Sequence, residues 1–215
     1  MPISRRYACG DVEIAVWAIE ETSEQLGEML GSESLLQHAR TFGSEARRAE
    51  WLAVRLLLRE VAGADARIEY ADSGKPRLAG ASGYISISHT RGYAAVALSQ
   101  KGPVGLDVEL QSRNAAVACS YVMKENEMAA VPVEWRAAYL LLRWTACEAV
   151  YKLVGGVDYK ESLSMPVFRP KQCGVFALSL LHDVSRSFSI GYLFDDGLLL
   201  TICAAADTLP PITRL

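Results

Sequence analysis

The spacing of hydrophobic positions predicts a chain that mixes strands and helices. Strands are predicted where apolar residues alternate with polar ones or form short runs bounded by turn residues, at 12–19, 66–70, 84–89, 93–99, 104–109, 174–181, 186–194 and 198–206. Apolar residues at helical spacing predict one long helix from about Ser44 to Ala62 and another from Pro132 to Gly155. Thr22 and Gln25 have the spacing of a capping box, which indicates a shorter helix after the first strand.

Both halves of the chain contain helix and strand patterns. We therefore expect an α+β fold of two similar, pseudo-duplicated lobes, at residues 1–102 and 103–215. The turn sequence SQKGP at 99–103 predicts that the strands on either side of it form a hairpin. The sequence DDG at 195–197 predicts another hairpin turn, between the last two strands.

Composition narrows the class of protein. The chain has 215 residues, 51% of them hydrophobic, which is typical of a soluble globular protein. Its formal net charge of −3 argues against binding to nucleic acids or anionic membranes. The five cysteines include no C-x-x-C pair, which disfavours disulfides and structural zinc and favours a reducing compartment. With no signal-peptide pattern and no long apolar span, we expect a cytoplasmic protein with no nucleic-acid or membrane partner.

The stretch VGLDVE at 104–109 places two acids on one face of an otherwise apolar strand. Because side chains alternate along a strand, Asp107 and Glu109 lie on the same face as Gly105. Two neighbouring carboxylates repel each other, and a hard cation such as Mg²⁺, which prefers oxygen ligands, would relieve that repulsion. A solvated strand face that carries acids without any function is the alternative.

The helix pattern WTACEAVYKL at 144–153 contains a third acid. Glu148 and Lys152 are four residues apart and share a face of the helix, where a surface ion pair is the simplest interpretation. If the helix packs across the strand, Asp107, Glu109 and Glu148 could together hold one Mg²⁺ ion and leave positions open for water and a substrate phosphate.

Arginines that could bind such a phosphate occur in the first half. Arg48, Arg55 and Arg59 lie on one face of the 44–62 helix by their spacing of seven and four, and Arg47 is beside them. A solvated basic face would have the same pattern, so the arginines alone do not indicate a site.

A turn and a strand end add further candidates. The turn DSGKPRL at 72–78 presents Lys75 and Pro76 on a constrained loop. The strand ISISHT at 85–90 ends in Ser88 and His89, which point to opposite faces because they are adjacent. They therefore cannot act as nucleophile and base for each other, which argues against a serine hydrolase.

The order of these segments is more specific than any one of them. The chain resembles the phosphopantetheinyl transferase superfamily in four segments that occur in the same order: GKPRL, ISISHT, VGLDVE and WTACEAVYKL. Within that superfamily it resembles the two-lobed, surfactin-synthetase-activating type. The resemblance runs from about Arg47 to Leu153. It implies an enzyme that moves the 4′-phosphopantetheine arm of coenzyme A to a serine of an apo acyl or peptidyl carrier protein. The reaction would require Mg²⁺ and would release adenosine 3′,5′-bisphosphate.

The same resemblance implies roles for individual residues. The magnesium ligands of the family are matched by Asp107, Glu109 and Glu148, and the lysine facing the pyrophosphate is matched by Lys152. The turn at the adenosine end is matched by Lys75 and Pro76, and residues at the phosphates are matched by Ser88 and His89. Positions near the 3′-phosphate are matched by Arg48 and Arg55. Glu148, or a water on the metal, would take the proton from the carrier serine. We expect Asp107 to face a cleft rather than the core, and we expect a monomer.

One position departs from the family pattern. The helix motif usually reads W-[ST]-x-K-E, and here Cys147 stands in place of the lysine before Glu148. Its side chain would lie either at the edge of the pyrophosphate or packed as a small apolar residue. We expect an active enzyme. The alternatives are a degenerate member that binds coenzyme A or carrier protein without catalysis, and an unrelated Mg²⁺-dependent phosphohydrolase.

Overall fold

The computed structural model describes residues 5–112, 123, 125–155, 163–180, 183–204 and 208–215. This part of the chain forms two five-stranded sheets, a two-stranded sheet and several helices, so the α+β prediction is confirmed. The first sheet has the order β12-β1-β2-β6-β5, built from β12 (Thr213–Arg214), β1 (Arg5–Cys9), β2 (Val12–Ala18), β6 (Tyr93–Ser99) and β5 (Tyr84–Thr90). The second has the order β7-β11-β10-β9-β8, built from β7 (Val104–Leu110), β11 (Leu198–Ala204), β10 (Asp183–Asp195), β9 (Cys173–Leu180) and β8 (Leu163–Ser164).

The remaining elements lie outside these two sheets. The small sheet pairs β3 (Arg67–Tyr70) with β4 (Pro76–Ala79). The helices are α1 (Ser23–Leu30), α2 (Glu33–Ala39), α3 (Glu45–Ala62), α5 (Glu125–Ala129) and α6 (Arg136–Val154). None of these described helices is long and apolar enough to cross a membrane.

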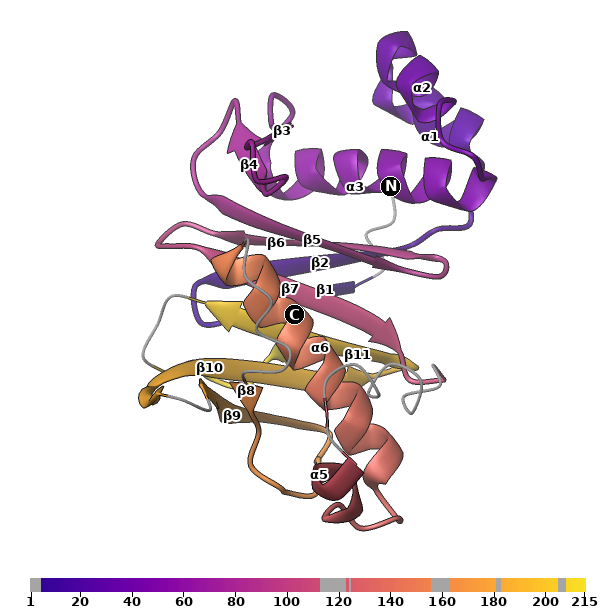
Figure 1. Ribbon diagram of the computed structural model, residues 1–215. Coiled ribbons are helices and arrows are strands. Elements are labelled where there is room, and N and C mark those ends of the chain that lie inside the picture. Colours follow the sequence, from indigo (N-terminus) through magenta and orange to yellow (C-terminus); the bar gives the residue numbers. More distant parts are fainter. Residues whose placement is uncertain (1–4, 113–122, 124, 156–162, 181–182, 205–207) are drawn as a thin grey trace.

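The two large sheets pack against each other, and a long helix covers the outer face of each (Figure 1). Ile14 of β2 and Leu106 of β7 belong to the core between the sheets. Val96 of β6 packs beneath α3, and Leu199 of β11 packs beneath α6. Because side chains alternate along a strand, a strand between two layers is apolar on both faces. This explains why several strands read as continuous hydrophobic runs.

Helix α3 is formed as its sequence predicts. The side chain of Ser44 accepts a hydrogen bond from the backbone N–H of Arg47 and caps the first turn. Gly63 follows the last turn with φ 100°, a conformation that favours glycine. The apolar stripe of this helix, which contains Ala53 and Leu57, is buried against the first sheet.

The hairpin predicted at 99–103 is wrong. A strand has two hydrogen-bonding edges, and β6 uses both of them, one for β2 and one for β5. The chain therefore crosses from the first sheet to the second between Ser99 and Val104, and β7 pairs with β11 instead. Near the C-terminus β12 returns to pair with β1. The division into lobes at residues 102 and 103 stays a prediction.

Helix α6 begins later than its sequence pattern indicates. The pattern places Pro132 in the first turn, but residues 133–135 form a separate turn and the helix starts at Arg136. The Arg136 side chain donates from Nε to the carbonyl oxygen of Val131 at 2.8 Å and holds this turn closed. The predicted end at Gly155 is confirmed.

Candidate active site

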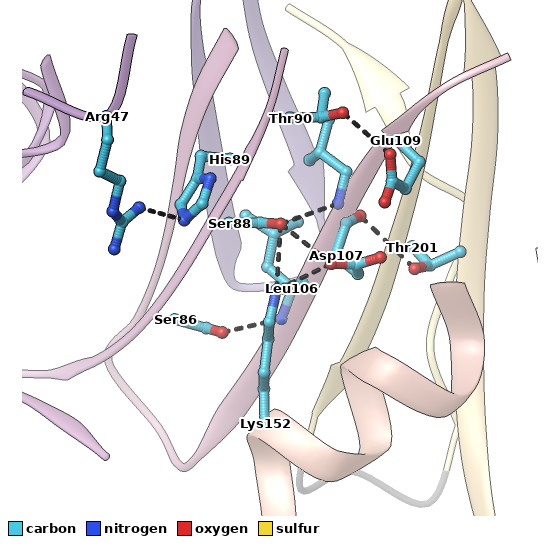
Figure 2. A network of polar contacts seen from close by, with 11 residues as sticks. Arg47, Ser86, Ser88, His89, Thr90, Leu106, Asp107, Glu109, Lys152 and Thr201 are labelled. Carbon is cyan, nitrogen blue, oxygen red and sulfur yellow. Dashed lines mark hydrogen bonds and ion pairs between the residues drawn. The ribbon is translucent and has the colours of Figure 1, made fainter. Parts of the chain in front are cut away.

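The two large sheets meet where their edge strands β5 and β7 lie side by side (Figure 2). The hydroxyl oxygen of Ser86 accepts a hydrogen bond from the backbone N–H of Leu106 at 2.9 Å. That of Ser88 accepts one from Val108 at 3.1 Å. An edge strand leaves its outward N–H groups without a strand partner, and buried N–H groups need one. Ser86 and Ser88 therefore join the two sheets, because their hydroxyl groups accept the hydrogen bonds that a neighbouring strand would otherwise accept.

A partly buried ion pair lies at the centre of this junction. Lys152 Nζ is 2.8 Å from Asp107 Oδ1, 3.0 Å from the Ser88 hydroxyl and 2.8 Å from the carbonyl oxygen of Leu106. The Ser88 hydroxyl in turn donates to Asp107 Oδ1 at 3.0 Å. Lys152 thus pairs with Asp107 across the junction, which brings three predicted site residues together from β5, β7 and α6.

The second carboxylate oxygen of Asp107 takes no part in this ion pair. The residue is 6% exposed, so it lies below the surface and not in the open cleft that the sequence predicts. Its Oδ2 atom is buried and has no hydrogen-bond partner in the described part of the chain. An unpaired buried carboxylate oxygen is unfavourable, and a cation would satisfy it. This atom therefore fits a metal ligand.

Glu109 lies two residues further along the same face of β7. It is 7% exposed, and its Oε2 accepts a hydrogen bond from the Thr90 hydroxyl at 2.8 Å. Glu148 is half-buried on α6. Across the described residues, no three His, Cys, Asp or Glu side chains lie close enough together to hold a metal ion. The three-acid magnesium site therefore stays a prediction.

Lys75 and Pro76 border a cavity of about 170 Å³ next to the ion pair. Lys152, Ser86 and Tyr151 line the same cavity. Lys75 Nζ donates to the carbonyl oxygen of Leu153 at 2.5 Å, and burial lowers the pKa of this lysine. Two lysines therefore line one small cavity between the β3–β4 turn, β5 and the end of α6, which gives the cavity the positive charge that an anion would need.

His89 lies on the opposite face of β5 from Ser88, as predicted, and contacts α3. Its Nδ1 is 3.2 Å from Glu50 Oε2, and its Nε2 is 2.5 Å from a guanidinium nitrogen of Arg47. A neutral imidazole donates from one nitrogen and accepts at the other, so these contacts place the proton on Nδ1. Arg47 consequently carries the positive charge at this position, and Glu50 orients the ring. His89, Thr90 and Glu109 line one cavity of about 510 Å³.

The two arginines predicted near the 3′-phosphate, Arg48 and Arg55, do not line the cavity of His89, and their role stays a prediction. Arg48 donates from Nε to the carbonyl oxygen of Phe42 at 2.9 Å. The Arg55 guanidinium lies 3.0 Å from the ring centre of Trp51. It is Arg47 that contacts His89. Because successive residues of a helix are rotated by about 100°, the spacing of the arginines could not show which of them faces the strand.

Cys147 is completely buried in the core between α6 and the second sheet. Leu199 and Cys203 of β11 belong to the same cluster. The sequence allows this side chain either at the edge of the pyrophosphate or packed as a small apolar residue, and the structure has it packed. The family's lysine therefore has no counterpart in the junction here, and the charged group that α6 supplies there is Lys152.

Cys147→Lys is expected to lower the melting temperature without raising activity, because the new ammonium group would be buried in an apolar core without a partner. Such burial costs several kcal/mol of unfolding free energy, on the order of 3 kcal/mol or more. Val154→Lys, at a position of the same helix that is 39% exposed, is the matched control and is expected to melt close to the wild type. Equal melting temperatures for both variants would contradict the placement of Cys147.

The protonation of His89 gives a pH dependence with a defined sign. Burial, and after it the positive charges of Arg47 and Lys152, lower the pKa of His89 from 6.5 to about 4. Between pH 6.5 and 4 the unfolded chain binds a proton that the folded chain excludes, so the folded state loses stability as the pH falls through this window. In Arg47→Ala the pKa of His89 is expected to rise, as followed by NMR of the imidazole. An unchanged pKa would show that Arg47 does not contact the ring.

Comparison with curated proteins gives a consistent group of relatives, although no model of a protein family matches the chain. A protein named 4′-phosphopantetheinyl transferase AcpT from Salmonella typhimurium is 33% identical over 154 residues, which cover 67% of this chain and 80% of the relative. The protein of the same name from Salmonella typhi is 32% identical over the same shares. That from Escherichia coli K12 is 33% identical over 159 residues, or 67% of this chain and 79% of the relative.

Proposed function

The chain belongs to the 4′-phosphopantetheinyl transferases, and from this we propose that it transfers the 4′-phosphopantetheine arm of coenzyme A to a serine of an apo acyl or peptidyl carrier protein. The observation that carries the proposal is the cluster of Lys152, Asp107 and Ser88 between the sheets, beside the cavity of Lys75. Adenosine 3′,5′-bisphosphate is the product released.

Coenzyme A is a polyanion, and the residues of the junction suit one. Lys75 and Lys152 would face its pyrophosphate from two sides of the 170 Å³ cavity. In phosphoryl transfer, catalysis rests mainly on placing the reacting groups and on stabilising the charge that develops on the phosphate oxygens. Lys152 is held by Asp107, Ser88 and Leu106, so its ammonium group is positioned before the substrate arrives.

We assign a Mg²⁺ ion to Asp107 and Glu109, with Glu148 as the third acid. The unpaired Oδ2 of Asp107 and the burial of both strand acids support this assignment. When bound, the ion would neutralise charge on the pyrophosphate. Glu148 is half-buried on the helix above the strand, and we assign it the removal of the proton from the attacking serine.

The bond changes balance within this assignment. The carrier serine oxygen forms a bond to the phosphorus atom next to the pantetheine, and the bond from that phosphorus to the bridging oxygen breaks. The electron pair leaves with adenosine 3′,5′-bisphosphate, and the serine proton passes to Glu148. No oxidant or reductant is required.

The release of adenosine 3′,5′-bisphosphate, measured with and without an apo carrier protein, tests the proposal. Release that requires the carrier is the expected result. Release from coenzyme A alone would indicate a phosphohydrolase, and binding of coenzyme A without release would indicate a non-catalytic member; either would contradict the proposal.

Arg47 is expected to recognise the 3′-phosphate of coenzyme A. Because His89 is neutral and accepts a hydrogen bond from Arg47, the guanidinium is the group at this position that attracts an anion. Arg47→Ala should therefore weaken coenzyme A binding about ten-fold more than binding of dephospho-coenzyme A. Arg48→Ala removes the neighbouring charge, which is directed at Phe42, and serves as the control. Equal losses for the two ligands in Arg47→Ala would place Arg47 elsewhere along the coenzyme.

A further inference from the structure

A third cavity, separate from the junction, lies on the first half of the molecule. It has a volume of about 490 Å³ and is bordered by α3, by β3, and by the first turn of α2 with the chain that precedes it. Arg55 and Arg59 of α3 and Arg67 of β3 line it. It shares no lining residue with the Lys75 cavity or with the His89 cavity. A ligand in it would therefore not touch the proposed reaction site.

The charges around this cavity are all of one sign. No acidic residue lines it, and none of its three arginines forms an ion pair within the part of the chain that the structure describes. Arg55 and Arg59 are four residues apart on α3, a spacing at which like charges repel. One guanidinium nitrogen of Arg59 donates to the Leu30 carbonyl oxygen at 2.8 Å, and one of Arg55 donates to the Trp51 carbonyl oxygen. Arg55 also forms a side-chain hydrogen bond with Tyr70. A guanidinium has five N–H donors, so donors still remain for a ligand.

The other walls of the cavity restrict the ligand further. Leu35, Leu58 and Ile68 supply an apolar surface, and Ser34 supplies a hydroxyl group. Three guanidinium groups exceed what a single carboxylate can neutralise, whereas a phosphate monoester carries nearly two negative charges and accepts paired N–H donors from arginine. Burial lowers the pKa of Arg55 to about 10, which still leaves it charged at neutral pH.

We propose that this three-arginine cavity binds a small phosphate monoester with an apolar portion, the phosphate on the arginines and the apolar portion on Leu35 and Ile68. The inference goes beyond the proposed transfer reaction and does not require it. Since the cavity lies apart from the junction, its ligand would bind in addition to the substrate and not in competition with it.

Calorimetric titration of the full chain with hexyl phosphate tests the proposal. We expect binding to the wild type, and a loss of about ten-fold or more in Arg67→Glu, which reverses one charge at the cavity. Arg67 lies on an exposed position of β3, so the variant should melt like the wild type. Arg67→Ala, with a smaller loss, checks that the effect follows the charge. Inorganic phosphate should bind more weakly than hexyl phosphate, since it lacks the apolar portion.

Two further variants distinguish binding in this cavity from a general effect of net charge and from binding at the junction. Arg169→Glu changes the net charge equally at an exposed position outside the cavity and should bind hexyl phosphate as the wild type does. Lys75→Ala should also leave this binding unchanged. Equal binding by the wild type and Arg67→Glu would overturn the proposal, as would a loss confined to Lys75→Ala, which would place the ligand at the junction. Hexanoate binding as tightly as hexyl phosphate would overturn the assignment to a phosphate.

Discussion

Asp107→Asn is expected to lower the rate of phosphopantetheine transfer by at least about a hundred-fold, because the amide keeps the shape of the side chain but removes the charge that holds Lys152 and would bind the metal. One carboxylate oxygen accepts from Lys152, and the other, which has no hydrogen-bond partner among the described residues, would bind the metal. Rates measured at saturating coenzyme A and at several Mg²⁺ concentrations give the size of the loss.

Asparagine is the informative replacement at this position. Both replacements remove the ion pair with Lys152, but the amide oxygen of asparagine can still accept a hydrogen bond from the ammonium group. Alanine would leave that group without this acceptor and would destabilise the fold further. Asp11→Asn, which removes an acid paired with the exposed Lys101, is the matched control and should transfer at the wild-type rate. A folded Asp107→Asn variant with wild-type turnover at limiting Mg²⁺ would contradict the assignment of Asp107.

Gly105→Ala is expected to destabilise the chain by about 3 kcal/mol or more, the upper end of the cost of overpacking a core. A Cβ atom at Gly105 would lie 1.9 Å from the carbonyl oxygen of Ala149 and 2.8 Å from the backbone nitrogen of Leu153. The helix would have to move away from β7, which would also separate Lys152 from Asp107. Denaturant unfolding measures the loss.

Gly43→Ala is the control for this substitution. A Cβ atom at Gly43 would have no neighbour within 4 Å, and the φ of this glycine is not positive, so alanine there is expected to be close to neutral. If Gly105→Ala were as stable as Gly43→Ala, α6 could not lie as close to β7 as the structure has it. Loss of activity together with stability in Gly105→Ala alone is the expected pattern.

Local patterns in the sequence were sufficient to predict most of the helices and strands. The caps of α1 and α3, the apolar stripe of α3 and the turn before β11 follow from residue types at fixed spacings, and the structure has each of them. The same local rule placed Ser88 and His89 on opposite faces of β5. These features depend on neighbours within a few residues, which a single sequence contains.

Pairing between distant segments could not be derived in the same way. The turn at 99–103 looks like a hairpin turn, but whether β7 pairs with β6 depends on whether β2 and β5 already occupy the edges of β6. The alternating hydroxyls of Ser86, Ser88 and Thr90 were visible as a period of two. Their contacts with β7 required knowing that two sheet edges meet there.

The cluster at the junction could be anticipated in Asp107 and Lys152 more than in the arginines around it. Asp107 and Glu109 stand out because acids are rare on a buried strand face, and Lys152 follows from the spacing on α6. Glu50 and Arg47 were missed because their importance comes from contact with His89, 39 and 42 residues away by their numbers. Arg47 and Arg48 are adjacent on α3, and only the packing of the helix against β5 decides which of them contacts His89.

The mass of an apo carrier protein after incubation with the chain, coenzyme A and Mg²⁺ tests the central claim most directly. Wild-type protein is predicted to add one phosphopantetheine group to the carrier serine, and fragmentation should locate the added mass on that residue. A carrier with that serine changed to alanine should gain nothing, and Asp107→Asn should modify the normal carrier far more slowly. An unchanged carrier mass with the wild-type protein, under conditions in which the chain is folded and binds coenzyme A, would contradict the account.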